Sequence, residues 1–266
     1  MSNRVDYIDQ LARESARFAD AIGQAAAEAR VPTCPDWNSD DLLWHLGEVQ
    51  WFWAAVVREG VSGDEADKLK PERPADRAGL EAFYQQASRD LGEILAASAP
   101  DAVAWTWSDD DQTVGFIRRR QAHEALIHRI DAELTAGVRT PIDAQLAADG
   151  VDEALRVMYG GVPDWGTFTP DPARTVRFLA QDTGDSWHVT LGLFTGTDPD
   201  GGVSYSEPDI HAAEKDSGAK TAAEISGSAA DLDCWLWHRP TLGPIQRSGD
   251  PDVLGDFDAA IKPGIN

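Results

Sequence analysis

The spacing of apolar residues changes once along this chain, and the change divides the sequence into two parts. Before Gly160 and Gly161, apolar residues recur at intervals of three, four and seven, which is the repeat of an amphipathic helix. After these glycines they alternate with polar residues, as in a strand with one buried face. A helical part followed by strands and helices predicts an α+β protein. We therefore expect a helical domain at 1–165 and a C-terminal α/β domain at 166–266.

Terminal signals support several of these predicted elements. Asn38 can cap a helix with Asp41 as its capping-box partner, and Gly137 suits the C-terminal end of another. In the first part, the expected helices span roughly residues 6–29, 38 to at least 56, 76–97, 113–136 and 143–158. In the second part, we expect strands at 175–181, 187–191 and 221–225, a helix at 228–237 and a last helix that begins at 250.

The charge balance argues against several classes of function. The chain has 46 acidic and 23 basic residues, which gives a net charge of −23. Such a charge repels phosphate backbones and anionic lipids, so we expect no nucleic-acid partner and no membrane partner. The sequence has no long apolar run and no signal-peptide core. Its two cysteines, Cys34 and Cys234, form no metal-binding or disulfide pattern, and we expect a cytoplasmic protein.

Polar residues interrupt the inward stripe of the predicted helix at 113–136. Glu124 and His128 lie one turn apart there, where a carboxylate and an imidazole need a partner such as a divalent metal. His45, on or beside the buried face of another predicted helix, completes a set of two imidazoles and one carboxylate. This set is typical of catalytic zinc and also of non-haem iron. The alternative is a buried His–Glu hydrogen bond to which His45 is unrelated. Arg120 either orients Glu124 or belongs to a solvated arginine run.

Three segments of the sequence resemble one known family. The segments VPTCPDWNSDDLLWHLGEVQWFW and RRRQAHEALIHRIDAE resemble the two metal motifs of the mycothiol-dependent maleylpyruvate isomerase family, which is part of the DinB/YfiT-like superfamily. The segments ADLDCWLWHR and IQRSGD resemble its C-terminal domain, in which a final strand and helix follow an LWGR motif. His238 stands where that motif has its glycine, so the C-terminal match is the weaker one.

The resemblance implies a fold, a metal site and a cosubstrate. The fold would be a DinB-like four-helix bundle followed by a small α/β domain that resembles sterol-carrier proteins. The metal, usually zinc, would be bound by His45, Glu124 and His128, and the thiol would be mycothiol, the actinobacterial counterpart of glutathione. Arg239 aligns with an arginine that the family uses near its active site, where a guanidinium can clamp a carboxylate. The alternative for Arg239 is a surface position at a helix end.

These expectations lead to one principal function and two alternatives. A thiol with a pKa near ~8.5 is mostly protonated at neutral pH, and coordination to a metal removes its proton. The thiolate can then add to the electron-poor double bond of a small electrophile. Addition followed by elimination gives an isomerase, and addition alone gives an S-transferase. The alternatives are a metal-dependent hydrolase of a small molecule and a non-catalytic protein that binds a small ligand.

Overall fold

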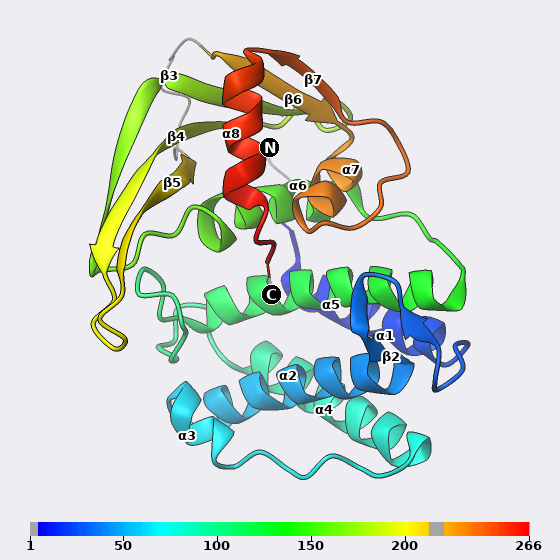
Figure 1. The fold of residues 1–266 in the computed structure, drawn as a ribbon. Helices are drawn as coiled ribbons and strands as arrows, with labels where there is room; N and C mark the ends of the chain where they lie inside the picture. The colour runs from blue at the N-terminus through cyan, green and yellow to red at the C-terminus, as the bar shows by residue number, and fades with distance from the viewer. Residues whose placement is uncertain (1–4, 213–220, 266) are drawn as a thin grey trace. The chain divides into compact units, whose positions relative to one another are not determined.

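The chain divides into two compact units, Met1–Pro141 and Ile142–Asn266 (Figure 1). This computed structural model describes residues 5–212 and 221–265. The sequence placed the division at 165/166 because all five early helices were assigned to the first domain. The fifth of them, α6 (Ala144–Glu153), instead shares a buried apolar cluster with the strands of the second unit. The spacing of apolar residues identifies the buried face of a helix, but it does not tell which other element that face packs against.

The first unit consists of helices and one short hairpin. Its elements are α1 (Tyr7–Ile22), β1 (Arg30–Val31), β2 (Cys34–Asn38), α2 (Ser39–Glu59), α3 (Gly63–Asp67), α4 (Arg77–Ala97) and α5 (Val114–Ala136). Helix α1 packs against α5, and α2 packs against α4 and α5. The antiparallel strands β1 and β2 lie directly before α2. This arrangement places α2 and α5, the two helices with the predicted metal motifs, side by side.

The predicted start of α2 and the predicted C-terminal end of α5 are confirmed, and the predicted C-terminal end of α1 is wrong. Asn38 and Asp41 form the expected capping box at the start of α2. Gly137 ends α5 with a left-handed φ of 72°. Helix α1 ends at Ile22 rather than near residue 29. Its apolar stripe stops there, so the alanine-rich residues 23–29 have helix propensity but too little apolar surface to hold a helix in place.

A buried ionic network joins α1 to α5. The guanidinium of Arg129 is fully buried and donates to Glu14 on α1 at 2.7 Å and to Glu133 on α5 at 3.0 Å. Glu133 also accepts from the hydroxyl and the backbone N–H of Thr140. Charges that lose contact with water must be paired and hydrogen-bonded. The network therefore fixes the position of α5 on α1.

The second unit is a mixed sheet with helices packed on one of its faces. Its elements are α6, a π-helical turn (Ala154–Met158), β3 (Gly166–Ala180), β4 (Ser186–Thr197), β5 (Ser204–Ala212), β6 (Ala223–Gly227), α7 (Ala229–Leu236), β7 (Gln246–Gly249) and α8 (Pro251–Ile261). The strand order is β5-β4-β3-β6-β7, in which β3 and β6 are parallel and the other pairs are antiparallel. These two units together confirm the α+β class.

One face of this sheet carries the core and the other carries charge. Phe178 of β3 belongs to the same buried cluster as Val151 of α6, Leu232 of α7 and Phe257 of α8. The next residue toward the N-terminus, Arg177, points to the opposite face and pairs with Glu224 of β6 at 2.9 Å. This alternation is the strand pattern expected from the sequence. Strands β3 and β4 are longer than predicted, whereas β6 has the predicted length and begins two residues later. Strand β5 was not predicted because the turn-rich residues before it obscured the pattern.

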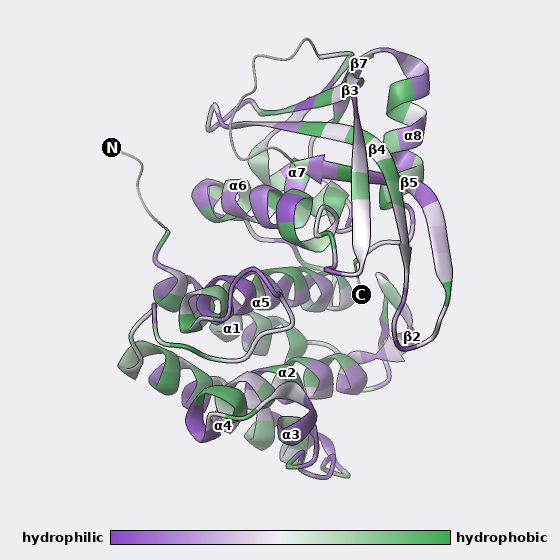
Figure 2. Ribbon diagram, turned by 90° about the vertical axis from the view of Figure 1, so that its left-hand side faces the viewer, coloured by the Kyte–Doolittle hydropathy of each residue, from purple (hydrophilic) through white to green (hydrophobic). Residues whose placement is uncertain are grey.

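The long helices of the first unit carry both hydrophobic and hydrophilic residues. Figure 2 shows hydrophobic and hydrophilic segments along each long helix of the first unit, as expected for helices with one face in a core. Within residues 5–212 and 221–265, no helix has both the length and the apolar character required to cross a membrane.

The chain leaves α7 through a left-handed residue that is not glycine. The N–H of Arg239 donates to the carbonyl of Cys234 at 2.7 Å, and the N–H of His238 donates to that of Trp235 at 3.0 Å. These two bonds define a Schellman motif, in which the left-handed position is usually glycine. Here it is His238, with φ of 57°. The LWHR departure noted in the sequence therefore lies at the one position of the turn where a side chain is strained.

We expect His238→Gly to stabilise the protein by about 1 kcal/mol, because glycine adopts this conformation without a steric penalty. Urea unfolding of both proteins measures the difference. His211→Gly is the matched control, since His211 is exposed in the extended strand β5 and its replacement should be destabilising. A His238→Gly protein that is less stable than the wild type would contradict the assigned strain.

Candidate metal centre

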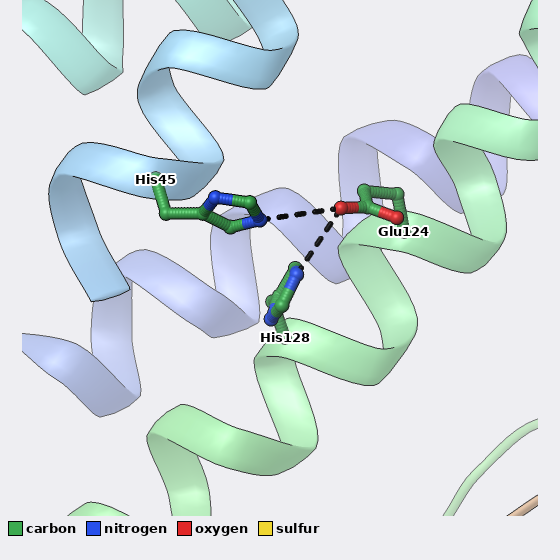
Figure 3. Close-up of side chains that lie close together, drawn as sticks. All are labelled: His45, Glu124 and His128. Atoms are coloured by element: carbon green, nitrogen blue, oxygen red, sulfur yellow. Dashed lines mark hydrogen bonds and ion pairs between the residues drawn. The ribbon is translucent and has the colours of Figure 1, made fainter. Parts of the chain in front are cut away.

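Three predicted side chains converge in the first unit. His45 comes from α2, while Glu124 and His128 come from α5, and Figure 3 shows them pointing toward one another. Glu124 Oε1 lies 3.1 Å from His128 Nε2 and 3.6 Å from His45 Nε2. One ligand atom from each residue lies within 4.8 Å of the other two. The residues combined from sequence spacing are thus brought together by the fold.

Local structure explains how the three groups reach one point. Glu124 and His128 are four residues apart on α5, so they lie on one face of the helix, one above the other. His45 lies one turn after Asp41, whose capping box fixes where α2 begins. Because α2 packs against α5, its inward face places His45 opposite the Glu124–His128 pair.

The separations of the three donor atoms bear on whether they could hold a metal. At 3.1 Å, the Glu124–His128 contact is a hydrogen bond. At 3.6 Å, the contact of His45 with the same oxygen is longer than a hydrogen bond. Donors bound at 2.0–2.2 Å around a tetrahedral ion lie about 3.4 Å apart, close to both separations. Two imidazole nitrogens and a carboxylate oxygen also suit a divalent ion chemically, so the residues present fit a metal.

A buried arginine holds the carboxylate of this group. Arg120 Nη2 donates to Glu124 Oε2 at 3.1 Å, and only 4% of the Arg120 side chain is exposed. The neighbouring Arg118 donates to the carbonyls of Leu95 and Ser98 near the end of α4. Residues 118–120 are therefore not a solvated run, and Arg120 has the position of a group that orients Glu124 from behind.

The structure adds Asp131 and Thr33, which the sequence analysis did not single out, and it places Trp37 beside His45. Asp131 Oδ2 lies 3.0 Å from His128 Nδ1, and Thr33 Oγ1 donates to Asp131 Oδ1 at 2.6 Å. The ring of Trp37 lies with its centroid 4.7 Å from that of His45. An acid three residues after His128 on the same helix was the available sequence signal for Asp131. No local signal marked Thr33, because its contact spans 98 residues.

The charges around Glu124 and His128 set the protonation of both. Burial alone raises the pKa of Glu124, but His128, His45 and Arg120 outweigh it and hold the pKa well below its usual value. Burial alone lowers the pKa of His128, but the carboxylates of Glu124 and Asp131 outweigh it and raise the pKa to about 9. Without a metal, this pair is therefore an ionised carboxylate and an imidazolium at neutral pH.

Two further residues named in the sequence analysis are Arg239 and Cys34. Arg239 follows the Schellman turn of the second unit, where its Nη1 donates to the carbonyl of Trp237 at 2.7 Å. Its role as a carboxylate clamp stays a prediction. Cys34 is partly buried and packs beside the apolar cluster of the first unit, in the manner of a small apolar residue.

Comparison with known proteins identifies the family models that the chain matches and the solved structures whose fold is similar. Residues 8–133 match the family model of the mycothiol maleylpyruvate isomerase N-terminal domain, and residues 145–256 match that of the MDMPI C-terminal domain. A crystal structure of the mycothiol-dependent maleylpyruvate isomerase superposes with a TM-score of 0.59 at 10% identity, over 92% of this chain and 93% of the other. A histidine-to-alanine mutant of that enzyme superposes with a TM-score of 0.60 at the same identity and coverage. No curated protein matches significantly.

We expect the stability of the chelator-treated protein to fall between pH 6.5 and pH 9. A pKa of about 9 in the folded state stabilises that state fully below 6.5, the value of a free histidine, and the effect is lost as pH rises through 9. Wild-type unfolding free energy should therefore decrease by roughly 2–3 kcal/mol more than that of His128→Gln over this range.

Urea unfolding at a series of pH values measures this difference, with His211→Gln as the control at an exposed histidine. Equal pH profiles for the wild type and His128→Gln would show that His128 is not held in its charged form by the two carboxylates.

Proposed function

The chain belongs to the mycothiol-dependent maleylpyruvate isomerase family, and on this premise we propose that it is a metal-dependent enzyme that uses mycothiol as a thiol cosubstrate. It acts on a small electrophilic substrate, as an isomerase or as an S-transferase. The observation that carries the proposal is the convergence of His45, Glu124 and His128 from two helices. The family membership supports the use of mycothiol, and the donor set supports the metal.

His45, Glu124 and His128 hold the divalent ion, and we propose zinc because two imidazoles and a carboxylate form a typical catalytic zinc site. When bound, the ion lowers the pKa of a coordinating thiol so that the thiolate is available at neutral pH. Arg120 holds Glu124 Oε2, which directs Oε1 toward the two imidazoles. His128 must release the proton on Nε2 to become a ligand, and because Glu124 has to stay ionised as a ligand, this proton leaves to solvent. Trp37 forms an aromatic wall beside His45.

The remaining expectations from the family are proposals of the same kind. The helical unit is proposed to be a DinB-like four-helix bundle, and the sheet unit a domain of sterol-carrier type. We place the enzyme in the cytoplasm, where low-molecular-weight thiols are kept reduced. Its thiol would restrict it to organisms that make mycothiol, the actinobacteria.

Turnover assays separate the proposal from its alternatives. A panel of small electrophiles is incubated with the zinc-loaded protein and with the chelator-treated protein, each with and without mycothiol. The proposed enzyme consumes an electrophile only when thiol and metal are both present. A hydrolase consumes substrate without thiol, and a ligand-binding protein consumes none, so either result would overturn the proposed function.

We expect His128→Ala to lose both the metal and the turnover while the helical unit stays folded, because its apolar core does not depend on this side chain. Metal analysis after dialysis and far-UV circular dichroism measure these properties. His211→Ala, at an exposed position of β5, is the matched control and should keep both. Full zinc content in folded His128→Ala would exclude His128 as a ligand.

We also propose that Arg239 recognises a carboxylate of the substrate. Lysine keeps the charge but cannot form two parallel hydrogen bonds to a carboxylate. Arg239→Lys should therefore raise KM at least tenfold for carboxylate substrates and leave zinc content unchanged. Steady-state kinetics with matched acid and amide substrates test this role. An equal effect of the substitution on both substrates would contradict it.

A further inference from the structure

A buried carboxylate stands behind His128, on the side opposite Glu124. Asp131 is fully buried, and its Oδ2 lies 3.0 Å from His128 Nδ1. The other ring nitrogen, Nε2, lies 3.1 Å from Glu124 Oε1. The imidazole is thus held at both ends, and only the Nε2 end faces the convergence with His45.

The hydrogen bonds of Asp131 determine what it does to the ring. Thr33 donates its hydroxyl proton to Oδ1 at 2.6 Å, so that oxygen acts as an acceptor. A carboxylate that accepts at both oxygens requires a proton on His128 Nδ1. With Nδ1 protonated, Nε2 is the one ring nitrogen that can present a lone pair to a metal.

The hairpin before α2 fixes this carboxylate in turn. Thr33 lies in the turn between β1 and β2, and its partner lies 98 positions later on α5. The same hairpin carries Trp37, whose ring centroid lies 6.4 Å from that of His128. The hairpin therefore contacts His128 directly through Trp37 and indirectly through Thr33 and Asp131.

We propose that Asp131, held by Thr33, is a positioning residue that fixes the orientation and the tautomer of His128 so that Nε2 binds the metal. This inference rests on the proposed function, because it assumes that His128 is a ligand. The inference goes beyond that function by assigning a role to Asp131 and Thr33, which lie outside the ligand set. Hydrogen-bond partners of ligating histidines typically change metal affinity by about 10- to 100-fold when removed.

The first test compares zinc affinity among folded variants, by competition with a chromogenic chelator. Asp131→Asn keeps the size of the side chain but removes the charge that favours a proton on Nδ1, and it should bind zinc about 10- to 100-fold more weakly. Thr33→Val removes only the supporting hydroxyl, and it should weaken binding less than Asp131→Asn does.

Glu133→Gln is the matched control for these variants. Glu133 is a buried carboxylate on the same helix, and it accepts hydrogen bonds from Arg129 and Thr140. Its replacement removes the same charge and should lower stability while zinc affinity stays within about twofold of the wild type. A merely structural role of Asp131 would give the two variants the same zinc affinity.

The second test requires no variant. Nitrogen-15 NMR of the zinc-loaded wild type, with the His128 signals assigned, distinguishes the protonated ring nitrogen from the metal-bound one. We expect a proton on Nδ1 and zinc on Nε2. Zinc on Nδ1, or zinc affinity of Asp131→Asn equal to that of the wild type, would overturn the positioning role and leave the proposed function intact. A wild type that binds no zinc would overturn both.

Discussion

An ionised carboxylate on the inward face of a helix is stable only when positive groups compensate the loss of water around it. Glu124 has two positive partners, Arg120 and the imidazolium of His128, each at 3.1 Å, and the ring of His45 lies 3.6 Å away as a third neighbour. Arg120 and His128 lie on α5, one turn before and one turn after Glu124. The third comes from α2, so the packing of α2 on α5 and the electrostatics of Glu124 depend on each other.

Helix α5 carries two such buried charge networks, and they have different consequences. Arg129 joins Glu14 and Glu133 in a network whose positive and negative partners are all supplied by the protein. That arrangement holds α1 and α5 together. Around Glu124, by contrast, α5 supplies one carboxylate and one imidazole, and α2 supplies the second imidazole from His45. This set of donors suits a divalent ion. The first network is structural, and the second is the proposed reaction centre.

The sequence predicted most of what local chemistry controls. The capping box of Asn38 and Asp41, the left-handed Gly137 and the i, i+4 pair of Glu124 and His128 are all encoded within one or two turns, and the structure has all three. The resemblance to the family also holds, since both of its domains match along the chain. Short-range patterns did not encode the tertiary contacts. Helix α6 joins the sheet unit because of where its apolar face packs, and the contact of Thr33 with Asp131 joins residues that are distant in sequence.

The central claim is that the convergence on Glu124 is a metal centre rather than an ionic cluster complete in itself. Anomalous diffraction at the zinc absorption edge, from crystals of the zinc-loaded protein, tests this most directly because it locates the ion without reference to activity. The account predicts one strong anomalous peak within coordination distance of His45 Nε2, a Glu124 oxygen and His128 Nε2. The absence of a peak there, with hydrogen bonds alone joining the three side chains, would contradict it.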